Sequence, residues 1–214
     1  MNSELMALFV SSFVTLFVVI DPPGCVPIFS SLTSGTSAAH RRSMALRSVL
    51  IASGVLVAFA LGGEAFLGAL GISLAAFKIA GGVMVFLIAI DMVFEKRTQR
   101  RESRAEGVKA AAPDLEAEDI SVFPMAIPML AGPGSIASVM LLSARTDSLA
   151  AEAAVLAALV AVMVLTLLSL LAAAPIMKLM GAKFEGALTR LLGVVLAALA
   201  AQFVVDGIKQ SFSL

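Results

Sequence analysis

The fold of this chain is decided by its first apolar stretch, residues 5–33, which reads LMALFVSSFVTLFVVIDPPGCVPIFSSLT. A segment that crosses the ~30 Å hydrocarbon core of a bilayer needs about 20 mainly apolar residues. This stretch is longer, and Asp21, Pro22, Pro23 and Gly24 interrupt it. Because backbone polar groups inside a membrane must be satisfied within the segment, we predict a membrane-spanning helix with a break in it.

The rest of the chain has the same character. Of its 214 residues, 60% are hydrophobic and 14% are charged, and the mean hydropathy is +1.02, which is far from the composition of soluble domains. The sequence therefore predicts an all-α polytopic membrane protein. The first segment is not preceded by a positive charge and is too long for a cleaved signal peptide, so we expect it to be retained. The six predicted transmembrane helices are residues 5–33, 44–62, 74–94, 120–144, 149–174 and 187–208.

Basic residues gather on one side of this arrangement. The loops after the first, third and fifth spans hold twelve lysines and arginines, whereas the opposite side holds only Arg145 and Lys209. The positive-inside rule then places both termini outside, in the periplasmic or extracellular space. Residues 95–119 carry many charges of both signs and cannot bury a core. We expect a solvated cytoplasmic linker there, joining two halves, residues 1–94 and 120–214.

The two halves resemble each other. When the second half is laid over the first, Asp21-Pro22-Pro23-Gly24 aligns with Ala131-Gly132-Pro133-Gly134, and a slightly larger shift aligns Lys78-Ile79-Ala80-Gly81 with Arg190-Leu191-Leu192-Gly193. Since each half has three spans, an odd number, the second half enters the membrane from the opposite face. We therefore predict two inverted three-helix repeats with broken first and fourth helices, a construction typical of secondary transporters.

The predicted substrate-binding site lies at the two Pro-Gly helix breaks. Proline removes a backbone donor and glycine loosens the chain, so each break exposes amides and carbonyls inside the membrane. The amino end of the second half-helix favours a carboxylate, and the carbonyls beside Asp21 suit an ammonium group, so a zwitterion fits both poles. The alternative interpretation is that each break is only a kink required by helix packing. The predicted substrate-binding residues are Asp21, Pro22, Pro23, Gly24, Pro27, Gly132, Pro133, Gly134 and Ser135.

Several classes of function are disfavoured by what the chain lacks. One cysteine, Cys25, and one histidine, His40, support neither an internal disulfide nor a histidine-based metal site. The sequence contains no phosphate-binding GxxxxGK[ST] loop and no grouping of catalytic residues. We therefore expect no enzymatic activity, no cofactor, no metal and no nucleic-acid partner. The lines Gly54-Ala58-Gly62 and Gly193-Ala197-Ala201 are predicted to be helix-packing seams.

Three motifs in order, residues 21–29 (DPPGCVPIF), 77–82 (FKIAGG) and 126–136 (AIPMLAGPGSI), resemble the MarC family of six-span bacterial inner-membrane proteins. The resemblance covers essentially the whole chain. It implies a place in the bacterial inner membrane. Some members are described as exporters of small neutral amino acids such as glycine and alanine, and the family is distantly similar to LysE-type amino acid exporters.

The leading hypothesis is a secondary transporter that exports small neutral amino acids through a central site at the two breaks. The alternatives are an exporter or channel for another small solute or ion, and a membrane protein without transport activity. A channel is disfavoured because the spans supply few polar side chains for a continuous lining. The expected partners are a small, zwitterionic solute and the lipid bilayer. The sequence leaves the coupling ion, the direction of transport and assembly into a homo-oligomer open.

Overall fold

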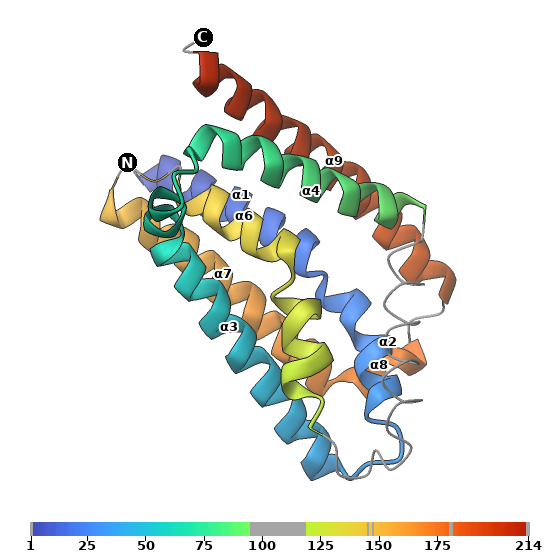
Figure 1. Ribbon diagram of the computed structural model, residues 1–214. Helices are drawn as coiled ribbons and strands as arrows, with labels where there is room; N and C mark the ends of the chain where they lie inside the picture. The colour runs from blue at the N-terminus through green and yellow to red at the C-terminus, as the bar shows by residue number, and fades with distance from the viewer. Residues whose placement is uncertain (1, 95–118, 145, 147, 180–181, 213–214) are drawn as a thin grey trace.

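The computed structural model describes residues 2–94, 119–144, 146, 148–179 and 182–212 of the chain. The predicted linker, residues 95–119, lies outside the described residues except for Asp119. All regular elements in the described part are helical (Figure 1). They are α1 (Asn2–Ile20), α2 (Pro22–Leu32), α3 (Ala38–Ala69), α4 (Leu74–Val93), η2 (Ser121–Leu130), α6 (Pro133–Ser143), α7 (Leu149–Leu171), α8 (Ala173–Leu179) and α9 (Ala182–Phe212).

The helices agree with a polytopic membrane protein. Five of them are long and apolar enough to cross a bilayer, and η2 with α6 adds a sixth span if this pair, bent by 54°, is counted as one. The predicted boundaries are wrong at α3. This helix has 32 residues, so it begins before and ends after the predicted span 44–62. Ser37 caps this helix by accepting a hydrogen bond from the backbone N–H of His40 at 3.1 Å, so the helix begins ahead of its arginines.

Two prolines distort η2, which is the least regular of the described helices. Phe123 and Ile127, the residues before Pro124 and Pro128, have extended backbone angles (φ −125°, ψ 130° and φ −127°, ψ 124°). Proline disfavours the helical conformation of the residue before it, so each X-Pro step interrupts the helical path. The cap at Ala131 donates to the carbonyl of Ala126 at 2.8 Å. The segment therefore reaches the second break as a series of turns.

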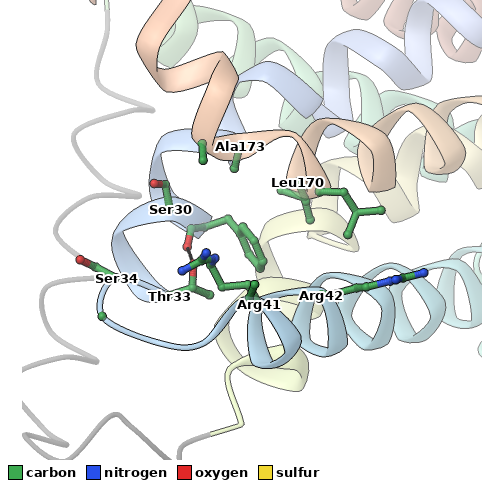
Figure 2. A pocket seen from close by; sticks show the side chains of 12 residues that line it. Ser30, Thr33, Ser34, Arg41, Arg42, Leu170 and Ala173 are labelled. Carbon is green, nitrogen blue, oxygen red and sulfur yellow. Dashed lines mark hydrogen bonds between the residues drawn. The ribbon is translucent and has the colours of Figure 1, made fainter.

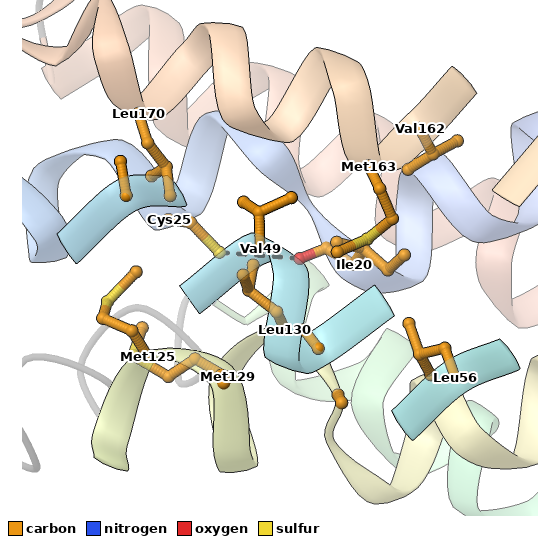
Figure 3. Close-up of a cluster of buried hydrophobic side chains, with 14 of the residues drawn as sticks. Ile20, Cys25, Val49, Leu56, Met125, Met129, Leu130, Val162, Met163 and Leu170 are labelled. Carbon is orange, nitrogen blue, oxygen red and sulfur yellow. Dashed lines mark hydrogen bonds between the residues drawn. The ribbon is translucent and has the colours of Figure 1, made fainter. Parts of the chain in front are cut away.

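Buried apolar side chains of α1, α2, α3, η2 and α7 form the main core. Figure 3 shows Cys25, Val49, Leu130 and Met163 meeting there from four different elements. The Cys25 thiol lies 3.6 Å from the carbonyl oxygen of Ile20 and donates to it, so an acceptor near the end of α1 gains a partner inside the core. This core surrounds the first break and encloses it.

The helices α4 and α9 form a separate antiparallel pair along one side of the molecule (Figure 1). Glycines let the two backbones approach closely. A methyl group on Gly82 would lie 2.9 Å from the carbonyl oxygen of Ala200, and one on Gly193 would lie 3.1 Å from that of Ala89. The seam predicted at Gly193 is confirmed.

The seam predicted along Gly54 and Gly62 is wrong. A methyl group on either glycine would meet no atom of the described residues within 4 Å. A small-residue line shows that close approach is possible, but it does not say which face of a helix has a neighbour.

The helix boundaries of the first half recur in the second half at a constant distance along the sequence. This offset brings Pro22 onto Pro133. The same offset relates all of Pro22–Leu32 to Pro133–Ser143, and it relates Ala38, the first residue of α3, to Leu149, the first residue of α7. The two close contacts between α4 and α9 are related in the same way. The two motif alignments made from the sequence are therefore each displaced by one position, in opposite directions. Asp21 corresponds to Gly132 rather than to Ala131.

Candidate functional site

The first break is a single residue between α1 and α2. Asp21 has a left-handed backbone conformation (φ 57°, ψ 66°), and its side chain accepts a hydrogen bond from the backbone N–H of Gly24 at 3.1 Å. Pro22, at the first helical position, has no N–H to satisfy. Asp21 is 3% exposed. The carboxylate that we expected to face a substrate ammonium group therefore caps α2 of its own chain.

Gly24 makes this cap possible. A methyl group on Gly24 would overlap the Asp21 carboxylate, so only glycine lets the carboxylate lie over the start of the helix. The aspartate brings a negative charge to the positive end of α2. At the first break, then, the protein already provides the anion.

The second break has the same place in the repeat but lacks that anion. Gly132 occupies the cap position of α6 in an extended conformation (φ −83°, ψ 171°) and, having no side chain, makes no side-chain cap hydrogen bond. Pro133 is again the first helical residue. A methyl group on Gly132 would overlap the carbonyl oxygen of Pro128, so the turn is closed tightly against η2. Gly132 and Gly134 are buried, whereas Pro133 is exposed. The amino end of α6 is thus a helix terminus without a carboxylate of its own.

Ser135 adds a hydroxyl to this terminus. The residue is 3% exposed. A serine hydroxyl can donate to an acceptor oxygen of a ligand.

The two breaks approach each other. A methyl group on Gly134 would lie 3.6 Å from a methyl carbon of Val19, which is two residues before Asp21, and would overlap the end of Ile88 from α4. The structure thus brings the start of α6 next to the end of α1, and Ile88 fills the remaining space. The helix that follows the first break, α2, has 11 residues, and η2, which leads to the second break, has 10.

Two further hydroxyl groups are buried on α1 and α6. The side-chain oxygens of Ser12 and Ser138 are buried and have no hydrogen-bond partner in the described residues. Ser138 was not predicted from the sequence, although the sequence did contain a signal for it. It lies about one turn after Ser135 on a helix that begins at Pro133, so the two serines share one face of that helix.

Two cavities open at the far ends of the half-helices that start at the breaks. The first, of about 490 Å³, lies at the end of α2, and the second, of about 190 Å³, lies at the end of α6. Neither is lined by any of the predicted substrate-binding residues. The offset that relates the helix starts also relates the linings: Phe29 corresponds to Met140, and Arg41 corresponds to Glu152.

An ion pair fixes the start of η2 to α3. Arg47 donates to the Asp119 carboxylate at 2.6 Å, and Asp119 also accepts from the Ser121 N–H at 2.9 Å and from the Ser121 hydroxyl. The hydrogen bonds from the Ser121 side chain and backbone lower the pKa of Asp119 below its ordinary value of 3.8, burial opposes this, and the Arg47 charge reinforces it. This anchor holds the segment that leads to the second break.

Known proteins match nearly the whole chain. A UPF0056 membrane protein of Methanocaldococcus jannaschii is 37% identical over 94% of this chain and 96% of its own length. The Bacillus subtilis UPF0056 membrane protein YvbG is 36% identical over 94% of the chain and 93% of its own length. The Escherichia coli inner membrane protein YhgN is 34% identical over 94% of the chain and 95% of its own length. No solved structure matches.

The model of the MarC family of integral membrane proteins matches residues 6–212. This match includes both breaks, all six spans and the motifs on which the resemblance rested. The apolar helices of the structure agree with an integral membrane location. The chain therefore belongs to the MarC family.

Proposed function

We propose that this protein is a secondary transporter of the inner membrane that exports small neutral amino acids and binds them between its two helix breaks. The amino end of α6, with its buried Ser135 hydroxyl, receives the solute carboxylate. The Asp21 carboxylate, whose oxygens can each accept more than one hydrogen bond, receives the ammonium group. The observation that carries the proposal is the difference between two equivalent cap positions: Asp21 supplies a carboxylate, and Gly132 supplies none.

The repeat supports transport by alternating access. Two halves of inverted orientation can form inward-open and outward-open states that exchange their conformations. The constant offset of helix starts, the matched α4–α9 contacts and the paired cavities all support this arrangement. Because Ile88 occupies the space beside Gly134, the present conformation is closed at the proposed site. Binding then requires a movement of α4 relative to α6.

Flux through reconstituted protein tests the proposal. Proteoliposomes loaded with radiolabelled alanine should release it saturably, and unlabelled glycine should compete. Gly134→Leu adds a bulky side chain where Ile88 already packs at the second break, and it should abolish the saturable component. Gly54→Leu is the matched control, because Gly54 faces no atom of the described residues within 4 Å and its replacement should leave the flux intact.

A milder variant separates binding from folding. Ser135→Ala removes one hydroxyl and should raise the KM several-fold with little change in the amount of folded protein. If wild-type release equals that of empty liposomes under imposed proton and sodium gradients, the amino acid assignment is wrong. Other small solutes would then be screened with the same Gly134 and Gly54 variants.

A further inference from the structure

The larger cavity lies where three membrane-spanning segments end together. Its walls come from the end of α2, the first turns of α3 and the junction between α7 and α8 (Figure 2). Two of the candidate membrane-spanning helices end at Leu32 and Leu171, and a third begins at Ala38. We therefore place the cavity at the boundary between hydrocarbon and water. This is the side on which the basic loops gather.

Positive charge and hydroxyl groups line one wall. Arg41 lies beside Thr33 at the turn between α2 and α3, whereas Arg42 extends the other way along α3 (Figure 2). One nitrogen of Arg41 donates to the carbonyl oxygen of Thr36 at 2.7 Å. A guanidinium has five N–H donors, so most of its donor capacity is available for an anion. Ser30 and Ser34 add hydroxyls, and no carboxylate is among the described residues that line the cavity.

The opposite wall is apolar and partly open to lipid. Leu170 and Ala173 lie across the cavity from the arginines (Figure 2). Leu171 is 45% exposed at the same level, and Ala174 is exposed beside it. A ligand that fits both walls has a phosphate next to a hydrocarbon chain. A soluble phosphate would use only the first wall.

The equivalent cavity at the other end of the molecule has the opposite charge. It is lined by Glu64 and Glu152, and Glu152 takes the place in the repeat that Arg41 has in the first cavity. A phosphate would be repelled there. The repeat therefore provides two cavities at equivalent positions, of which only one suits an anion.

We propose that the cavity at Arg41 and Arg42 binds the headgroup of an anionic phospholipid from the adjacent leaflet, with its phosphate on the Arg41 guanidinium and an acyl chain along Leu171 and Ala174. Arg42, which also lines the cavity, adds positive charge to it. Basic pockets between transmembrane helices at this level recognise anionic lipid headgroups. The proposal does not depend on transport. It assigns the cavity a ligand that would hold α2, α3 and the α7–α8 junction together.

Native mass spectrometry of the purified full-length protein in detergent tests this with phosphatidylglycerol and phosphatidylcholine. Wild type should bind phosphatidylglycerol preferentially. Arg41→Gln should weaken that binding about fivefold, and the Arg41→Gln, Arg42→Gln double variant should weaken it further and abolish the preference. Arg47→Gln removes the same charge from the same helix outside the cavity, so it should retain the preference.

A second variant tests the apolar wall without changing charge. Ala174 is exposed, so Ala174→Trp should fold, fill the cavity mouth and lower phosphatidylglycerol binding at least as much as Arg41→Gln. Equal binding of both lipids by wild type overturns the proposal, as does an equal loss of binding in Arg47→Gln. Competition by glycerol phosphate at the concentration at which phosphatidylglycerol binds would also overturn it, because the ligand would then be a soluble phosphate.

Discussion

Among single residues, Gly24 is the one on which the geometry of the first break depends. Gly24→Ala should displace the Asp21 carboxylate from the amino end of α2, because the added methyl group overlaps it. Loss of a helix cap costs about 1 kcal/mol. We expect a lower melting temperature in detergent. Gly54→Ala is the control, since its methyl group meets no described atom, and an equal loss in both variants would contradict the role of the cap.

Asp119 gives a pH-dependent contribution to stability outside the membrane. Its pKa in the folded protein is lowered, mainly by hydrogen bonds from Ser121, so folding stabilises the ionised form. This stabilisation is fully present above the ordinary value of 3.8 and is lost as the pH falls through the lowered folded value. Thermal unfolding should therefore separate wild type from Asp119→Asn at pH 7, and the difference should vanish at strongly acidic pH. A difference that is constant with pH would contradict it.

The sequence predicted the residues of the breaks but not how they are used. Asp-Pro-Pro-Gly is also the pattern of a helix cap followed by proline at the first helical position, and that interpretation would have placed Asp21 over α2. Ser138 was missed because a single serine in an apolar helix is usually bonded to its own backbone. Whether it has that bond depends on the tertiary neighbours, and these are visible only in the structure.

Among the helices, the α4–α9 pair should be sensitive to the size of its glycine positions. Gly193→Val places a branched side chain against Met92 and the carbonyl of Ala89, where a methyl group already lies closer than ordinary contact. Overpacking of this kind costs about 1–3 kcal/mol. Melting of purified protein should show this loss. Gly62→Val, on the open face of α3, should change stability much less, and equal losses would show that β-branching alone is responsible.

The presence of the helices could be predicted from the sequence. Their ends and contacts could not, because these depend on local chemistry. Apolar length predicted the five long spans and the bent pair of η2 and α6, because the bilayer sets the length of a span. The start of α3 was missed because polar residues such as Arg41 and Arg42 were assigned to a loop, although Ser37 is a cap that begins a helix through them. The Lys78 side chain donates to Gln210 at 2.8 Å and so joins α4 to α9.

For the whole molecule, the repeat relates two parts that differ in charge. Equivalent positions keep the helix starts and the cavities but exchange Arg41 for Glu152 and Asp21 for Gly132. The positions of the helix starts and of the cavities are thus preserved between the halves, whereas the charges of the side chains are not. The sequence showed the repeat through its Pro-Gly motifs. The register of the repeat needed the helix boundaries, because neighbouring prolines and glycines allow the motifs to align in more than one way.

The proposed inversion of the two halves makes a prediction about sidedness. Ser37 and Ser148 occupy equivalent positions of the repeat and cap α3 and α7 in the same way. Their side chains accept from the backbone N–H three residues on, at 3.1 and 3.2 Å. Replacing each by cysteine removes the same kind of cap, so the two variants should be equally stable. The native Cys25 is buried and should react little.

An impermeant maleimide should label Ser148→Cys on intact cells and Ser37→Cys only after permeabilisation, because the positive-inside rule puts the loop at Ser37 in the cytoplasm. Ser73→Cys, in the exposed turn between α3 and α4, should be labelled like Ser148→Cys. Labelling of Ser37→Cys and Ser148→Cys from the same side would mean that equivalent helices enter the membrane in the same direction. Alternating access through exchange of two inverted halves would then be impossible, whatever solute the protein carries.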